Sequence, residues 1–186
     1  MRIITYQNKK VVDIIKKKGE HKITSKKMMK TYNFFLRPPY VNNPYEEAYD
    51  YIINRMKKLI SKEDLDDDII APIWGWASYK SIRKLNKDNP NAYKITLEIP
   101  EDKLLLTDFY LYEDTMVGKL HSVCDTDEEY EEARRREKES GKEETYKLYD
   151  RMLNLKEAEY VQATFWKIKK EYVVSIRKVR RKKKKE

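Results

Sequence analysis

The chain has 186 residues, with 41 Lys and Arg against 32 Asp and Glu and a formal net charge of +9. This length suits one domain with a hydrophobic core, and an aromatic content of 12% argues against a wholly disordered chain. A single cysteine, Cys124, excludes an intrachain disulfide, and with no signal-peptide pattern and no apolar run of about 18 residues we expect a cytoplasmic protein without a membrane partner.

The first 40 residues predict a strand, a helix and a second short strand. Residues 2–7 are β-branched and aromatic, as is typical of a strand. Valines and isoleucines then recur at helical spacing over 11–18, and three lysines followed by Gly19 predict the end of that helix. Residues 21–24 predict a short strand, whereas 28–40, which end in two prolines, predict an irregular segment.

The clearest amphipathic helix is predicted over residues 44–61. Asn43 and Pro44 are typical of an N-cap followed by proline at the first helical position. Apolar side chains at helical spacing share one face of this segment, and most of the lysines and the arginine lie on the other.

Three more strands are predicted in the middle of the chain. The run 69–77 is apolar, with Gly75 between two tryptophans, and a polar stretch with a turn follows at 80–92. Residues 93–99 alternate between apolar and polar side chains, and 103–109 predict a strand or the entry from a strand into a helix.

The last third of the chain contains a charged insertion and a return to apolar sequence. Residues 125–147 are almost wholly charged, and pairs such as Glu131 with Arg135 support an exposed helix that has little to bury. Residues 161–179 predict a hairpin-like pair of apolar runs. The fold class is therefore α+β: one domain over 1–176, with a small, mainly antiparallel, split or mixed sheet flanked by two helices.

Charge is concentrated at the two ends of the chain. Residues 1–30 carry a net charge of +8 and residues 177–186 a net charge of +7, whereas the segment between them is net −6. The basic tail, residues 177–186, is expected either to hold nucleic-acid phosphates without sequence preference or to be a disordered solubilising end. The candidate nucleic-acid-binding residues are Arg177, Lys178, Arg180, Arg181, Lys182, Lys183, Lys184 and Lys185.

The usual catalytic signatures are missing from the sequence. Four isolated glycines cannot build a phosphate-binding loop. His121 and Cys124 are three positions apart but lack a second ligand pair, so we expect no metal, and a bystander cysteine is favoured over a thiol nucleophile. Three carboxylates lie outside the charged runs, at Glu98, Asp108 and Glu171, and acid–base work by any of them requires a partner within reach.

The two tryptophans around Gly75 are predicted to share one face of a strand. Core packing is the ordinary role of such a pair, and the alternative is that Trp74 and Trp76 form the wall of a pocket for a planar ligand.

The order of motifs along the chain resembles one family in particular. The sequences at 3–19, 48–58, 72–76, 97–109 and 161–166 together look like those of a family of bacterial and phage proteins known as a domain of unknown function. Val12 stands where that family often has tryptophan. The charged insertion and the basic tail lie outside the resemblance.

A second, more distant resemblance carries a function. The succession of strand, helix, Gly19 and strand, followed by the sequences at 97–109 and 161–179, is similar to ADP-ribosyltransferase-like proteins, especially those acting on nucleic acid. This resemblance implies an ADP-ribosyltransferase-like fold and NAD as the cofactor, with Thr5 and Gln7 at the first motif. It places Gln162 and Thr164 at the last motif, where Thr164 stands at the position of the family's glutamate.

The leading hypothesis is an ADP-ribosyltransferase-like domain that binds NAD or a related nucleotide and modifies nucleic acid or protein, in the setting of phage–host conflict. Its nucleotide-sized cleft is expected to contain ligand-binding and candidate catalytic residues: Thr5, Gln7, Trp74 and Trp76 for the ligand, and Asp108 and Gln162 for catalysis. The tryptophans would hold a flat ring, the glutamines would hydrogen-bond ribose or amide, and Asp108 would be the acid.

Two alternatives remain open at the level of the sequence. One is a non-catalytic phage or mobile-element protein that inhibits a nucleic-acid-handling host complex, which the threonine at the glutamate position favours. The other is a structural partner protein without a ligand. The leading hypothesis is favoured by two polar residues that stand in apolar strands, Gln7 and Gln162.

Overall fold

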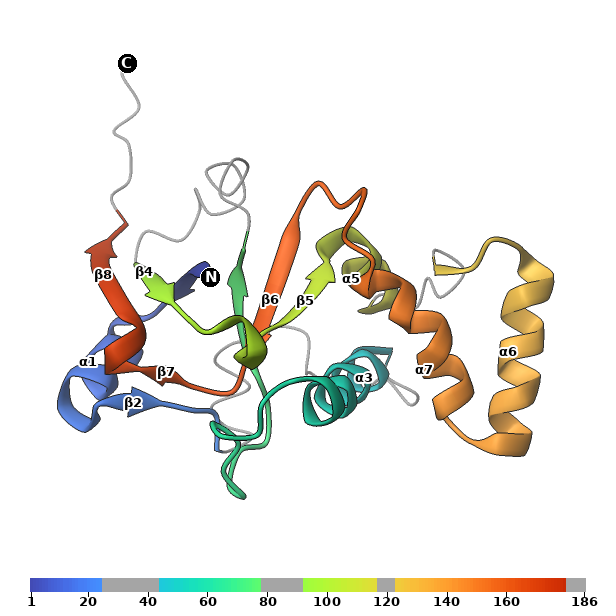
Figure 1. Ribbon diagram of the computed structural model, residues 1–186, viewed down its shortest axis with the longest axis horizontal. Helices are drawn as coiled ribbons and strands as arrows, with labels where there is room; N and C mark the ends of the chain where they lie inside the picture. Colours follow the sequence, from blue (N-terminus) through green and yellow to red (C-terminus); the bar gives the residue numbers. More distant parts are fainter. Residues whose placement is uncertain (25–43, 78–91, 117–122, 180–186) are drawn as a thin grey trace, which may run out of the picture.

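The computed structural model describes residues 1–24, 44–77, 92–116 and 123–179 (Figure 1). The irregular segment predicted at 28–40 and nearly all of the polar stretch predicted at 80–92 lie outside these ranges. The strands are β1 (Arg2–Gln7), β2 (Glu20–His21), β3 (Ile73–Trp76), β4 (Tyr93–Glu98), β5 (Leu105–Asp108), β6 (Val161–Phe165), β7 (Ile168–Lys169) and β8 (Val173–Lys178). The helices are α1 (Lys9–Lys18), α3 (Pro44–Leu59), α5 (Phe109–Met116), α6 (Asp127–Ser140) and α7 (Glu143–Tyr149).

The fold is α+β, as predicted, and is built on a six-stranded sheet in the order β5-β6-β3-β1-β4-β8. Every neighbouring pair of strands in this sheet is antiparallel. β1 pairs with β4 along its whole length, from Arg2 opposite Glu98 to Gln7 opposite Tyr93. In contrast, β1 and β3 share a single paired position, Ile4 opposite Trp76. The sheet therefore consists of two three-stranded halves that meet at a narrow contact.

Helix α1 forms where the sequence predicts it, with a cap at each end. The Asn8 side chain accepts a hydrogen bond from the backbone N–H of Val11 at 3.0 Å, which satisfies a free donor of the first turn. Gly19 ends the helix at φ 82°, a left-handed conformation that favours glycine, and its N–H donates to the carbonyl of Ile15 at 2.9 Å. Val12 and Ile15 are buried against the sheet.

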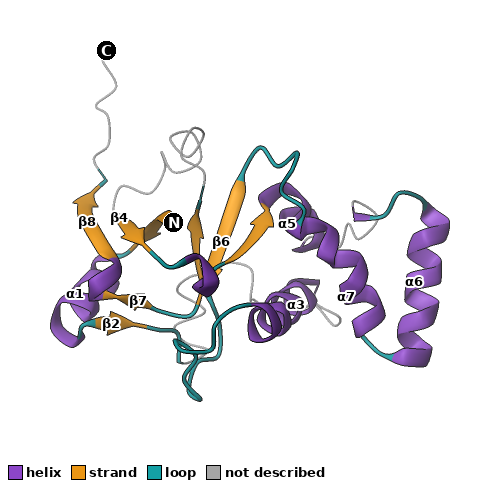
Figure 2. Cartoon of the chain, viewed as in Figure 1, coloured by secondary structure: helices purple, strands orange, loops and turns teal. Residues whose placement is uncertain are grey.

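The buried apolar residues form two hydrophobic clusters. One combines α1 with residues of the central strands, such as Ile3, Leu97 and Phe165. The other combines α3, α5 and α7 and includes the fully buried Tyr51 and Tyr149. Figure 2 shows the same division, with α3, α5, α6 and α7 gathered on the side of β5 and α1 on the side of β8.

The charged insertion forms two helices, α6 and α7, instead of one. Helix α6 buries none of its residues, as the sequence predicts, and is capped at its N-terminus by Thr126, whose hydroxyl accepts from the N–H of Glu129 at 3.1 Å. Helix α7 differs from the prediction, because Thr145 and Tyr146 are buried and Tyr146 belongs to the same hydrophobic cluster as α3. The insertion thus supplies part of the core.

The hairpin predicted for residues 161–179 is wrong. β6 pairs with β3 and β5, whereas β8 pairs with β4 at the far edge of the sheet, and β7 lies between them along the chain. β8 also extends into the basic tail, since Arg177 lies opposite Lys94 and Lys178 opposite Tyr93. The remaining basic residues, from Arg180 to Lys185, lie outside the described residues. No helix in the described ranges is long and apolar enough to cross a membrane.

Candidate functional site

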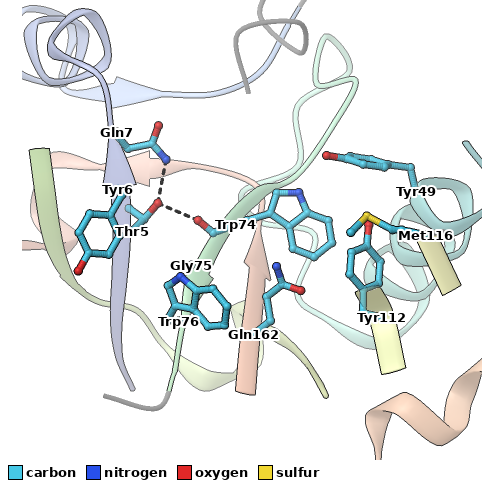
Figure 3. Close-up of a pocket in the computed structure, with 10 residues that line it drawn as sticks. All are labelled: Thr5, Tyr6, Gln7, Tyr49, Trp74, Gly75, Trp76, Tyr112, Met116 and Gln162. Carbon is cyan, nitrogen blue, oxygen red and sulfur yellow. Dashed lines mark hydrogen bonds between the residues drawn. The ribbon is translucent and has the colours of Figure 1, made fainter. Parts of the chain in front are cut away.

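A pocket of about 260 Å³ opens where β1 and β3 separate (Figure 3). Five of the six residues predicted for the cleft line it, and the sixth, Asp108, is not among the lining residues. The lining residues are Thr5, Tyr6, Gln7, Tyr49, Trp74, Gly75, Trp76, Tyr112, Met116 and Gln162. Segments far apart in the chain therefore converge on one cavity.

Gly75 allows β3 to lie close to β1 and β6 at this point. A Cβ atom at position 75 would lie 2.5 Å from Cγ2 of Ile3, which is closer than carbon atoms pack, and 3.3 Å from Cε1 of Phe165, which is a tight contact. Because successive side chains of a strand alternate between faces, Trp74 and Trp76 project together on the face opposite to these core contacts. Both tryptophans line the pocket, on the shared face that the sequence predicts.

A short chain of hydrogen bonds links the two separated strands. The hydroxyl of Thr5 donates to the backbone carbonyl of Trp74 at 2.7 Å, and thereby satisfies a carbonyl that faces the gap. The amide Nε2 of Gln7 donates to the same hydroxyl at 2.8 Å. Thr5 and Gln7 are 1% and 4% exposed, so these hydrogen bonds are shielded from bulk solvent. Both bonds are drawn in Figure 3.

The walls of the pocket are largely aromatic. Helix α3 contributes Tyr49, whose ring meets that of Trp74 edge-on at a centroid distance of 5.8 Å. Helix α5 contributes Tyr112, at 4.7 Å from Trp74. Complete burial raises the pKa of Tyr112 well above its ordinary value, so its phenol stays protonated. Trp76 meets Phe109 at 4.8 Å, which continues the aromatic surface beyond the pocket.

Four polar atoms of the lining side chains are buried and have no hydrogen-bond partner within the described part of the chain. They are Oε1 of Gln7, Nε1 of Trp74, the hydroxyl of Tyr112 and Oε1 of Gln162. Buried polar atoms are nearly always paired, and leaving one unpaired costs about 1–3 kcal/mol. Their concentration in one pocket is what is expected of a site that a ligand or ordered water completes.

The described lining carries no charged side chain, since its residues are aromatic, amide, hydroxyl, thioether and glycine. Such a surface suits a flat ring with hydrogen-bonding edges better than a phosphate, which is held by cations or helix N-termini.

Asp108 and Thr164 have structural partners instead of a place in the lining. One oxygen of Asp108 accepts from the backbone N–H groups of Tyr110 and Leu111, at 2.8 and 3.3 Å, and so caps helix α5. Thr164 is fully buried and donates to the carbonyl of Leu105 at 3.2 Å. The predicted catalytic role of Asp108 therefore gains no support from its position.

The other singled-out carboxylates lie on the surface. Glu98 is 3.7 Å from Arg2 and Glu171 is 3.9 Å from Lys169, in exposed or partly exposed ion pairs. The pKa of the Cys124 thiol is raised, mainly because the side chain is partly buried, and the thiolate form is therefore disfavoured. His121 lies outside the described residues.

Sequence reasoning missed the tyrosines and the methionine of the pocket. Tyr49 belongs to the apolar face of a predicted helix, and nothing in that pattern separates a pocket wall from the core. Tyr112 and Met116 lie on α5, which the sequence predicts no further than its entry. Tyr6 belongs to the predicted first strand, where it lies between the two predicted ligand-binding residues Thr5 and Gln7.

Comparisons with known proteins match the chain to a protein family. No curated protein and no solved structure gives a significant match to the chain. The family model described as a domain of unknown function, DUF3841, matches residues 2–174, which is nearly the whole chain. The protein therefore belongs to the DUF3841 family.

Proposed function

We propose that this protein binds NAD or a related nucleotide, with a flat heteroaromatic ring held in the pocket between β1 and β3. The observation that carries the proposal is the set of four unpaired buried polar atoms, all belonging to lining residues within the described ranges. Together with aromatic walls, these atoms offer both stacking surfaces and hydrogen-bonding partners to such a ring.

The size of the pocket supports binding of one ring instead of a whole dinucleotide. Pockets that enclose drug-sized ligands measure about 300–1,000 Å³, and this one is about 260 Å³. The ring would enter the pocket, and the phosphates would lie outside the uncharged lining.

Transfer of ADP-ribose to nucleic acid or protein is the further step that the resemblance implies, together with a role in phage–host conflict. A carboxylate is the group that would stabilise the positive charge of such a transition state, and the described lining holds none. Thr164, at the position of the family's glutamate, is occupied by its bond to Leu105. These observations favour nucleotide binding over transfer as the property to test first.

The test is a thermal-shift and fluorescence titration with NAD, ADP-ribose and AMP. Two of the three tryptophans, Trp74 and Trp76, line the pocket, so a bound ring should change the intrinsic fluorescence. Saturation at 100 times the dissociation constant should stabilise the protein by about 2.7 kcal/mol. Gln162→Ala should weaken binding while the unliganded protein stays folded.

Trp166→Phe is the matched control, because Trp166 is buried in the second hydrophobic cluster and does not line the pocket. This variant should keep the ligand-induced change in fluorescence and in melting temperature. If saturating nucleotide moves neither signal in the wild-type protein, the proposal is wrong. If Gln162→Ala unfolds the protein, Gln162 has a structural role and its place in the site is not supported.

A further inference from the structure

The direction of the Gln7 side-chain amide follows from its neighbours. A hydroxyl carries one proton, and Thr5 donates its own to the carbonyl of Trp74 at 2.7 Å. Toward Gln7, the oxygen of Thr5 can therefore only accept, and Gln7 must present its amide nitrogen, which lies at 2.8 Å. The carbonyl oxygen of the Gln7 side chain is therefore the atom that has no hydrogen-bond partner among the described residues.

This arrangement determines what the pocket lacks. Oε1 of Gln7 and Oε1 of Gln162 are hydrogen-bond acceptors without a donor among the described residues. Nε1 of Trp74 can only donate, and it too has no partner there. A ligand complementary to this arrangement supplies an N–H group to the oxygen of Gln7 and an acceptor to the indole of Trp74. The hydroxyl of Tyr112 can take either role.

We infer, on the basis of the proposed function, that the pocket selects a ring that carries a primary amino or amide group beside an acceptor atom, and that Gln7 is the residue that decides this. Adenine fits this description through its amino group and the neighbouring ring nitrogen. Nicotinamide fits it through the N–H₂ and the carbonyl of its carboxamide. Hypoxanthine and nicotinic acid place an oxygen where these rings have the amino nitrogen, so that two acceptors would meet.

Two ligand pairs test the inference and identify the ring. AMP and IMP differ at the amino group of the purine, and NAD and nicotinic acid adenine dinucleotide differ at the carboxamide. We expect the amino or amide member of one pair to bind at least about tenfold more tightly, because its partner leaves buried acceptors unpaired. Selection within the AMP pair places adenine in the pocket, and selection only within the NAD pair places nicotinamide there.

Substitutions at the hydrogen-bond chain separate selectivity from folding. Gln7→Met keeps the length of the side chain but removes the acceptor, and Thr5→Val releases the amide of Gln7 so that it can turn. Both should bring the affinity ratio of the selective pair close to one. Thr5→Ser keeps the hydroxyl and should keep the ratio. Thr107→Val is the control outside the pocket, where a fully buried hydroxyl has no partner among the described residues.

The results distinguish this inference from the proposed function beneath it. The inference is supported if the wild-type protein is selective, Gln7→Met loses this selectivity and Thr107→Val keeps it. The melting temperatures must show that all three proteins are folded. Equal binding within both pairs overturns the inference and leaves nucleotide binding in place. Selectivity that persists in a folded Gln7→Met variant also overturns it. Failure of all four nucleotides to bind overturns both.

Discussion

Arg55 of α3 donates two hydrogen bonds to Asp150, from Nε to Oδ1 at 2.6 Å and from Nη2 to Oδ2 at 2.9 Å. The third guanidinium nitrogen, Nη1, donates to Glu143 at 2.9 Å. The Arg55 side chain is only 5% exposed, so a buried cation fastens the charged insertion to the body of the protein. Tyr51 adds a bond to the same carboxylate at 3.1 Å.

Replacement of this arginine should loosen the insertion. Arg55→Met should lower the free energy of unfolding by about 2 kcal/mol, less than the roughly 3–5 kcal/mol of a fully buried pair, because both carboxylates keep contact with water. Lys58→Met is the matched control, since Lys58 pairs with the same Glu143 but is half-exposed, and it should cost less than about 0.5 kcal/mol. Urea denaturation measures both, and equal costs would contradict this account.

Gly75 should be intolerant of even one methyl group. Gly75→Ala places Cβ 2.5 Å from Ile3 and 3.2 Å from the carbonyl oxygen of Ile4, so we expect a loss of about 2–3 kcal/mol through overpacking. Gly19→Ala provides the comparison, because its site is open and only its φ of 82° opposes a side chain. That variant should lose about 1 kcal/mol. A Gly75→Ala protein as stable as Gly19→Ala in urea would show that the strands can move apart.

His21 should make the stability depend on pH. Burial lowers the pKa of His21 to about 4, whereas the unfolded chain takes up this proton near pH 6.5. The folded pKa is the lower one, so stability is complete above pH 6.5 and falls as the pH drops from 6.5 to 4. The loss should reach about 1.4 kcal/mol per pH unit.

His21→Phe should flatten this part of the stability profile. His121→Gln alters the other histidine of the chain and should leave the slope in place. Chemical denaturation at half-unit steps of pH measures it. A wild-type profile that is level between pH 4 and 6.5 would mean that His21 is not held neutral.

The basic tail should affect nucleic-acid binding only through its charge. A chain ending at Val179 loses six basic residues but keeps β8 and the bond from the N–H of Val179 to the carbonyl of Ala92. If every lost residue contacts a phosphate, the salt dependence of duplex DNA binding should fall by about 5 in log–log slope. The melting temperature of the truncated protein should equal that of the full chain. An identical slope would remove the tail from any such interface.

Local signals in the sequence were enough to predict most helices and strands. The Gly19 cap, the alternation in β4 and the apolar face of α3 are all properties of neighbouring residues, and the structure confirms them. The pocket was foreseen for a related reason. Gln7 and Gln162 stand in apolar strands, and Gly75 separates two tryptophans, so each of these residues conflicts with simple core packing.

What the sequence could not provide was pairing between distant strands. A hairpin is the shortest way to pair two consecutive apolar runs, yet β6 and β8 lie near opposite edges of the sheet, because each has a better partner elsewhere. Asp108, which is predicted for the cleft, is not among the residues that line the pocket. A carboxylate that follows an apolar run looks the same in sequence whether it serves chemistry or caps the next helix, and only the start of α5 at Phe109 decides.

The single paired position between β1 and β3 also bears on the motions of the protein. Amide protons along a fully paired ladder exchange with solvent only when the ladder opens. Because β1 and β3 share only the Ile4–Trp76 position, we expect the two halves of the sheet to open independently of each other. A molecule seated at this junction would contact both halves at once. Its arrival should slow hydrogen exchange on both sides of the seam together, and thus join two cooperative units into one.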